Sequence, residues 1–235
     1  MNDSRKTILA VGAHAGDMEV SCGAVLAKHA RLGDSVIMLH LTLGEGGNPS
    51  LSPGTYGKQK RREALAIGEI IGASVVFGPY ADGMVPDDEE VRRYVADIIR
   101  QVKPSHLITH WRKSIHKDHA RTHSIVNDAV LLASLEGVVT QHPRHRGVRS
   151  IAYAENWEDQ EGFTPYLYVD CSDDFERWRE WVVTYQFIKG GISSFDYLDY
   201  YSALARIRGA LVGKRYAVAF DIDPFEKKSV HDALH

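Results

Sequence analysis

The sequence is poor in cysteine, in long apolar runs and in any excess of charge of one sign. It has two cysteines, Cys22 and Cys171, which are too few for a disulfide framework and too far apart for a C-x-x-C motif. The 28 Lys and Arg nearly balance the 31 Asp and Glu, which disfavours a nucleic-acid-binding surface. Spanning a membrane needs about 20 apolar residues, and no segment of the sequence reaches this length. The apolar run at residues 8–13 is also too short for the core of a signal peptide. We therefore expect a cytoplasmic protein with no membrane span and no nucleic-acid partner.

What the sequence does contain is an ordinary globular composition with many histidines. Its 235 residues are 44% hydrophobic and 25% charged, and a chain of this length buries enough surface to be stable without a metal or disulfide. Any metal would therefore serve chemistry. The 12 histidines are the feature that needs an explanation.

Apolar runs and helical periodicities alternate along the first 135 residues. Strands are expected at residues 7–12, 35–42, 74–77 and 106–110. Helices are expected at residues 18–32, 58–71, 87–102 and 120–135. This alternation predicts a three-layer α/β/α, Rossmann-like fold around a mostly parallel sheet.

The pattern weakens after residue 135. It predicts short strands near 151–154 and 166–169 and helices around 175–189 and 197–211. No composition shift marks a domain boundary. We expect one domain over residues 1–220 and an exposed C-terminal tail over residues 221–235.

Histidines follow the first and the fourth predicted strands. Ligands of open α/β sheets bind beyond the carboxyl ends of the strands, so both places are candidate sites. A dinucleotide fingerprint is disfavoured, because Gly12 and Gly16 do not fit G-x-G-x-x-G. His14 would also fill the space in which the backbone must approach a pyrophosphate.

A catalytic zinc site fits this edge better, because zinc takes three ligands from histidines and carboxylates. His14 and Asp17 lie three residues apart in a strand-to-helix turn, and His119 follows the fourth strand. Taken singly, Asp17 is more typical of a helix N-cap, His14 of a hydrogen-bonded core histidine and His116 to His119 of a solvated loop. Their coincidence at one sheet edge favours the metal.

The other histidines give weaker predictions. His119 and His123 are four residues apart, but Ala120 stands where an H-E-x-x-H protease needs its glutamate. We expect His106 and His110 to pack in or at the end of a buried strand, with their hydrogen bonds satisfied.

Two motifs resemble the LmbE-like or PIG-L family of zinc-dependent N-deacetylases. The family's A-H-P-D-D-x-E motif is similar to AHAGDME, and its H-x-D-H motif is similar to HKDH, with LTLGEGG between them. The matching positions are Ala13, His14, Asp17, Glu19, His116, Asp118 and His119. The resemblance covers about the first two thirds of the chain.

The resemblance implies a reaction and a set of roles. Zn²⁺ would be held by His14, Asp17 and His119, and the substrate would be a small N-acetylated sugar conjugate. His116 would stabilise the oxyanion and protonate the leaving amine, with Asp118 orienting it and raising its pKa. Weaker matches imply substrate contacts from residues of three different segments. These are Glu45, Lys60 (usually Arg) and Asp82. The resemblance also implies a homo-oligomer, a trimer or a hexamer.

One departure concerns the general base. The family uses the first aspartate of its H-P-D-D motif, and that position is Gly16 here. Losing a general base typically costs about 10²–10⁴-fold in rate. Asp118, Glu45 and Glu19 are the candidates to replace it, and Trp157 and the loop 142–147 are candidates for the pocket rim.

Three functions therefore remain open. The first is a zinc-dependent, N-deacetylase-like amidohydrolase with a recruited base. The second is a catalytically impaired family member that keeps metal and ligand binding in a regulatory role. The third is different metal chemistry on a more reactive substrate that needs no strong base.

Overall fold

A seven-stranded mixed sheet organises the chain in the computed structural model, which describes residues 5–190 and 192–228. The strands are β1 (Thr7–His14), β2 (Ser35–Thr42), β3 (Ser74–Phe77), β4 (His106–Thr109), β5 (Ser150–Ala154), β6 (Leu167–Asp170) and β7 (Ala217–Ile222). Their order is β3-β2-β1-β4-β5-β7-β6. β1 to β5 are parallel, and β7 is antiparallel to both β5 and β6. The predicted mostly parallel sheet is confirmed.

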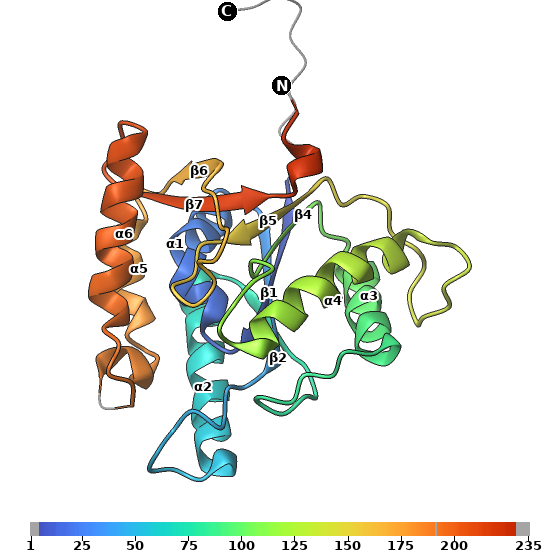
Figure 1. The fold of residues 1–235 in the computed structure, drawn as a ribbon, viewed down its shortest axis with the longest axis horizontal. Helices are drawn as coiled ribbons and strands as arrows, with labels where there is room; N and C mark the ends of the chain where they lie inside the picture. Colours follow the sequence, from blue (N-terminus) through green and yellow to red (C-terminus); the bar gives the residue numbers. More distant parts are fainter. Residues whose placement is uncertain (1–4, 191, 229–235) are drawn as a thin grey trace, which may run out of the picture.

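Helices cover both faces of the sheet (Figure 1). They are α1 (Asp17–Arg31), α2 (Pro53–Ile71), α3 (Glu89–Val102), α4 (Lys117–Ser134), α5 (Phe175–Val182) and α6 (Tyr197–Leu211), with two 3₁₀ turns, η1 (Gln186–Lys189) and η2 (Pro224–Glu226). In Figure 1, α1, α2, α5 and α6 lie on one side of the sheet, and α3 and α4 lie on the other. None of the described helices is long and apolar enough to cross a membrane.

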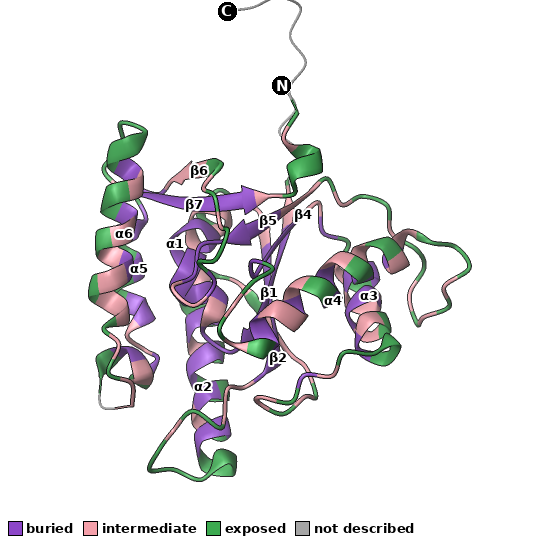
Figure 2. Cartoon of the chain, viewed as in Figure 1, coloured by how far each residue is buried: buried purple, intermediate pink, exposed green. Residues whose placement is uncertain are grey.

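The two apolar cores follow from the alternation of side chains along each strand. In β1, Ile8 and Ala10 pack against α1, α2, α5 and α6, whereas Leu9 and Val11 pack against α3 and α4. All four side chains are buried. Figure 2 shows the same result for the helices, whose buried residues face the sheet. The continuous apolar run of β1 is therefore the signature of a strand covered on both faces.

Two segments differ from the predicted elements. α2 begins at Pro53 rather than at residue 58, because Ser52 caps it by accepting a hydrogen bond from the Thr55 backbone N–H. The helix expected at 175–189 is split into α5 and η1, and the split follows the β-branched run Val182 to Thr184.

The predicted tail begins too early. Asp221 and Ile222 belong to β7 and pair with β5, and Asp221 is only 2% exposed. The boundary at residue 221 is therefore wrong, since a strand and a 3₁₀ turn follow it. Residues 229–235 of that predicted tail lie outside the described part of the chain.

The topology creates a crevice between β1 and β4. β2 and β3 lie on one side of β1 in the sheet. The chain then passes from β3 through α3 to β4, which lies on the other side of β1. Such a switch in strand order leaves an opening beyond the carboxyl ends of the two strands, where ligands bind. His14 is the last residue of β1, and His110 directly follows β4.

Candidate metal and catalytic site

A tight turn after β1 places His14 beside Asp17. Gly16 has a φ of 112°, which lets the chain turn from strand to helix within two residues. The Asp17 carboxylate accepts a hydrogen bond of 2.7 Å from the His14 backbone N–H. This bond holds the two side chains together, with 3.3 Å between His14 Nδ1 and Asp17 Oδ2.

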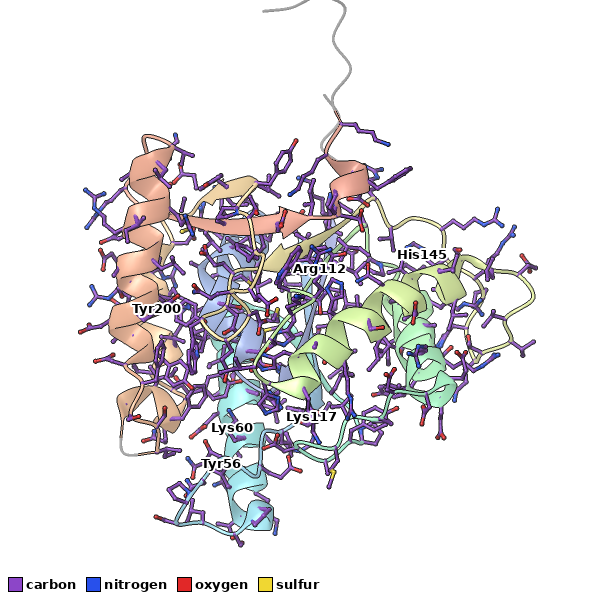
Figure 3. All side chains as sticks on the ribbon, in the orientation of Figure 1. Tyr56, Lys60, Arg112, Lys117, His145 and Tyr200 are labelled. Atoms are coloured by element: carbon purple, nitrogen blue, oxygen red, sulfur yellow. The ribbon has the colours of Figure 1, made fainter. Side chains whose placement is uncertain are left out.

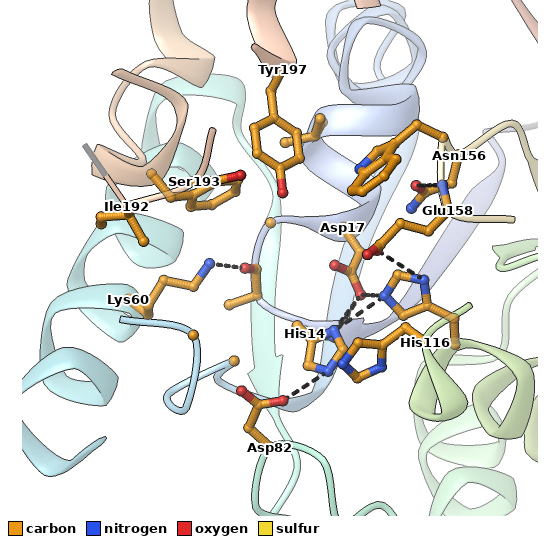
Figure 4. A pocket seen from close by; sticks show the side chains of 18 of the residues that line it. His14, Asp17, Lys60, Asp82, His116, Asn156, Glu158, Ile192, Ser193 and Tyr197 are labelled. Carbon is orange, nitrogen blue, oxygen red and sulfur yellow. Dashed lines mark hydrogen bonds and ion pairs between the residues drawn. The ribbon is translucent and has the colours of Figure 1, made fainter. Parts of the chain in front are cut away.

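His119, near the start of α4, adds a third candidate ligand atom. We call His14, Asp17 and His119 the ligand set. Nε2 of His119 lies 3.3 Å from His14 Nδ1 and 3.6 Å from Asp17 Oδ2. Three ligands at 2.0–2.1 Å from a tetrahedral zinc ion would be separated by about 3.4 Å. The three residues chosen from the sequence therefore bring one ligand atom each to the spacing that such an ion requires. Figure 4 shows two of them, His14 and Asp17, side by side.

Asp159, which the sequence did not single out, orients His119. Its carboxylate lies 3.0 Å from His119 Nδ1, so that nitrogen carries the proton and Nε2 presents its lone pair to the ligand set. Burial, followed by the charge of His110, lowers the pKa of His119 to about 4. The ring is therefore neutral near neutral pH, as a metal ligand must be.

His110, which the sequence assigned to packing, joins this network. It is fully buried, and its two ring nitrogens lie 3.0 Å from Asp159 and 3.0 Å from Asp17. Burial alone would lower the pKa of His110, but the hydrogen bonds to these carboxylates raise it to about 9. His110 therefore links Asp17 of the ligand set to Asp159, the partner of His119.

Replacing Asp159 with asparagine tests this network. We expect zinc affinity to fall about 10–100-fold, because the neutral amide no longer favours a proton on Nδ1 of His119. A competition titration against a chromophoric chelator measures the change. Asp199→Asn is the matched control, since Asp199 is exposed on α6. Wild-type zinc affinity in the Asp159 variant would contradict the assignment.

The other ring nitrogen of His14 faces two carboxylates. Its Nε2 lies 3.1 Å from Asp82 and 3.6 Å from Asp118. Burial opposes a charge on His14, but Asp17, Asp118 and Asp82 together raise its pKa well above the usual value. The same negative surroundings favour a metal cation bound through Nδ1. The sequence had suggested a substrate contact for Asp82, which the structure places against His14 at the edge of the cavity.

His116 lies beside His14, with ring centroids 4.5 Å apart. The predicted pairing of the Asp118 carboxylate with this ring is not what the structure records, because the Asp118 backbone N–H donates to His116 Nδ1 at 3.2 Å. Burial, followed by the charge of His14, lowers the pKa of His116, and Asp118 only partly opposes this. The neutral ring therefore carries its proton on Nε2 and acts as a hydrogen-bond donor.

The ligand set opens into a cavity of about 210 Å³. Five aromatic side chains line it, namely Tyr56, Trp157, Phe187, Tyr197 and Tyr201. Its polar lining comes from Lys60, Asp82, His116, Asn156, Glu158 and Ser193 as well as the ligand residues (Figure 4). Trp157, predicted at the rim, is among these residues, whereas the loop 142–147 is not.

The suggested replacements for the missing base lie elsewhere. Glu19 is completely buried and accepts a hydrogen bond of 2.7 Å from Tyr185. Glu45 accepts a hydrogen bond of 2.9 Å from the Asp82 backbone N–H, so it supports that loop rather than lining the cavity. Asp118 is buried against His14.

Glu158 is a carboxylate that sequence reasoning missed. It lines the cavity, 3.6 Å from His119 Nδ1, and its side chain is 22% exposed. Burial, together with the charges of Asp17 and Asp159, raises the pKa of Glu158 to about 7. Glu158 and Asp159 follow β5, a parallel neighbour of β4, so their place at the carboxyl edge was the signal that could have found them.

Gly16 lies against two side chains from other elements. A Cβ at this position would lie 2.9 Å from Phe187 Cζ and 3.4 Å from Lys60 Nζ. Lys60, on α2, donates a hydrogen bond to the Ala15 carbonyl oxygen beside it. The space that an aspartate side chain would need here is therefore occupied by an aromatic ring and an ammonium group.

Restoring the aspartate should destabilise the protein. We expect Gly16→Asp to lower the free energy of unfolding by about 1–3 kcal/mol, because of the positive φ and the contact with Phe187. Gly33→Asp is the matched control, since Gly33 has a φ of 87° but nothing within 4 Å of its Cβ position. Thermal unfolding compares them. A loss no greater than that of Gly33→Asp would contradict the steric argument.

Fold and site together define a class: α/β proteins that gather two histidines and a carboxylate at the switch point of a mostly parallel sheet. Comparison with known families makes this specific. The profile of the PIG-L family, described as GlcNAc-PI de-N-acetylase, matches residues 9–130, just over half of the chain. The chain belongs to this family.

Two curated relatives of this chain differ in activity. A 4-oxalmesaconate hydratase of Pseudomonas putida is 30% identical over 145 residues, which cover 58% of this chain and 56% of that protein. A 1D-myo-inositol 2-acetamido-2-deoxy-alpha-D-glucopyranoside deacetylase of Thermomonospora curvata is 30% identical over 164 residues, which cover 57% of this chain and 55% of that protein. The chain thus matches about half the length of these relatives.

Solved structures show the same fold over nearly the whole chain. The 4-carboxy-2-hydroxymuconate hydratase of Pseudomonas putida superposes with a TM-score of 0.84 at 22% identity, covering 98% of this chain and all of the other. The N,N'-diacetylchitobiose deacetylase of Pyrococcus horikoshii gives 0.83 at 21% identity, covering 94% and 85%. One architecture is therefore found in both a hydratase and a deacetylase.

Proposed function

We propose that the protein is a metal-dependent hydrolase that cleaves an N-acyl group, with N-acetylated sugars or sugar conjugates as the first substrates to test. The observation that carries this proposal is the ligand set of His14, Asp17 and His119, which faces a cavity bordered by Glu158. Membership of the de-N-acetylase family supports the reaction type. Zn²⁺ is the proposed ion, because nitrogen and carboxylate ligands at this spacing suit it.

A divalent ion bound there supplies Lewis-acid polarisation and lowers the pKa of water. The chain's own residues move the protons. Glu158 accepts a proton from the attacking water as the new C–O bond forms. His116 donates a hydrogen bond from Nε2 to the carbonyl oxygen, which becomes negative.

The same carboxyl group then completes the cleavage. Glu158 returns its proton to the nitrogen as the C–N bond breaks, which releases a carboxylic acid and an amine. This role falls to Glu158 rather than to His116, because the lowered pKa of His116 leaves it neutral and without a proton to spare at Nδ1.

A second candidate is a hydratase, which adds water to a polarised double bond. The observation that favours it is the pair Gly16 and Lys60, since an ammonium group stands where the resemblance places the base of a deacetylase. Water attacks the double bond of an unsaturated, conjugated carboxylic acid more easily than it attacks an unactivated amide. The hydratase among the curated relatives supports this alternative.

Assays of the zinc-loaded protein distinguish the two functions. Acetate release is measured on a panel of N-acetylglucosamine conjugates, and loss of ultraviolet absorbance is measured on a panel of unsaturated dicarboxylic and tricarboxylic acids. Chelator-treated protein is the control. Metal-dependent acetate release supports the hydrolase, whereas metal-dependent loss of absorbance alone supports the hydratase. Stoichiometric zinc binding with no turnover in either panel would overturn both and support an impaired, ligand-binding family member.

A further inference from the structure

Lys60 is a buried cation that pairs with no carboxylate of the described residues. Its side chain projects from α2 and the residue is only 4% exposed (Figure 3). Among the described residues its ammonium group makes one hydrogen bond, to the Ala15 carbonyl oxygen, and no carboxylate oxygen lies within 4 Å. Burial lowers the pKa of Lys60 to about 8, although several acidic residues farther away oppose this. A buried charge in this state is costly unless something else pairs with it.

The ammonium group borders the cavity rather than the core. Figure 4 shows Lys60 reaching toward the turn after β1, on the side of the cavity opposite Glu158. Its Nζ lies 4.1 Å from the ring centroid of Phe187 and 4.7 Å from that of Tyr185. These rings and the Ala15 carbonyl hold the group in place but leave at least one N–H uncommitted.

The nearest acidic residue on the same helix is engaged elsewhere. Glu63 accepts a hydrogen bond of 2.8 Å from Gln59 and faces the backbone N–H of Gln186 at 3.4 Å. Both bonds fall on Oε1 of Glu63, and no ion pair within 4 Å joins this carboxylate to Lys60 among the described residues. Lys60 therefore has no direct carboxylate partner among the described residues, and an acidic ligand in the cavity would supply one.

We propose that Lys60 binds a carboxylate group of the substrate, so that the N-acyl compound that the proposed function cleaves carries an acidic group and is not a neutral sugar. The position of the N-acyl group beside the ligand set rests on the proposed function. The carboxylate-binding subsite is inferred from the surroundings of Lys60 alone. A single ammonium group matches the single charge of a carboxylate. The cavity of about 210 Å³ and its aromatic walls limit the ligand to a small acid with an apolar or planar body.

The test measures binding rather than turnover, so it does not depend on the reaction being identified. Calorimetry on the zinc-loaded protein follows succinate and glutarate as carboxylate probes, inorganic phosphate as a different anion, and N-acetylglucosamine as a neutral probe. The variants are Lys60→Met and Lys60→Gln, the second of which keeps a donor for Ala15. Lys58→Met is the matched control, because Lys58 is an exposed lysine two residues away on α2.

We expect the dicarboxylates to bind about 10–100-fold more weakly to both Lys60 variants, since a charge-assisted hydrogen bond is lost. The Lys58 variant should bind as the wild type does, and N-acetylglucosamine binding should not change in any variant. If one Lys60 variant fails to fold, the other decides. No dicarboxylate binding to the wild type, equal binding to the Lys60 variants, or a Lys60-dependent preference for phosphate would each overturn the proposal. Lys60-dependent binding without turnover would leave the proposal standing while the proposed function fails.

Discussion

Replacing Glu158 with glutamine should lower kcat for water addition by about 10²–10⁴-fold, the range expected when a general base is removed. The amide keeps the shape of the side chain but cannot take a proton from water. Glu158 lines the cavity outside the ligand set, and its carboxylate accepts no hydrogen bond from the described residues. The two carboxylates beside His14 are already held against that ring.

The measurement is steady-state kinetics on whichever substrate the two assay panels identify, with zinc content determined on the same samples. Glu161→Gln is the matched control, since Glu161 is exposed in the same loop. Zinc content should be unchanged in both variants. An unchanged kcat in Glu158→Gln would assign the base to another group, and a parallel loss of zinc would show that Glu158 acts on the ligand set instead.

Replacing His119 with alanine should reduce zinc affinity more than about 100-fold. This exceeds the loss that is usual when a residue that only hydrogen-bonds to a metal ligand is removed. Without His119, only His14 and Asp17 remain of the three converging ligand atoms, and these two fill half of a tetrahedral coordination shell. Activity should fall to the level of chelator-treated protein. Zinc should also raise the Tm of the wild type but not of the variant, because an ion that binds the folded state stabilises it.

His123→Ala is the control that separates the two metal sets considered from the sequence. His123 lies one helical turn beyond His119 on α4, but its Nδ1 contacts the His110 carbonyl oxygen at 3.0 Å rather than the ligand set. We expect zinc affinity to be unchanged in this variant. A large loss in His123→Ala together with normal binding in His119→Ala would contradict the site as described.

The residues near the start of the chain were the most predictable part of the site. His14 and Asp17 are three residues apart, and β1 is a long apolar strand, so local pattern alone places them at a strand end. His119 was predictable because it follows the strand that pairs with β1. Its ligand role also agrees with the resemblance to the family's H-x-D-H motif.

Glu158, Asp159 and the surroundings of Lys60 were not predictable in the same way. Asp159 acts on His119 across 40 residues of sequence, and Phe187 reaches Gly16 from the C-terminal part of the chain. No short-range spacing encodes such contacts. The role of Asp118 also depended on which neighbouring atom it meets, and this differed from the prediction, whereas His110 is buried and hydrogen-bonded as expected.

The sequence by itself determined the alternating strands and helices, the sheet edge where the candidate site lies and three residues whose side chains converge there. These depend on side-chain periodicity and on the rule that parallel strands end at one edge, both of which are local properties of the chain. Only the tertiary structure decided what surrounds the ligands: the carboxylates behind each histidine, Glu158 at the cavity and Lys60 beside Gly16. Those contacts arise from packing between elements far apart in sequence. The charge that a substrate must carry is therefore inferred from the folded protein and not from its motifs.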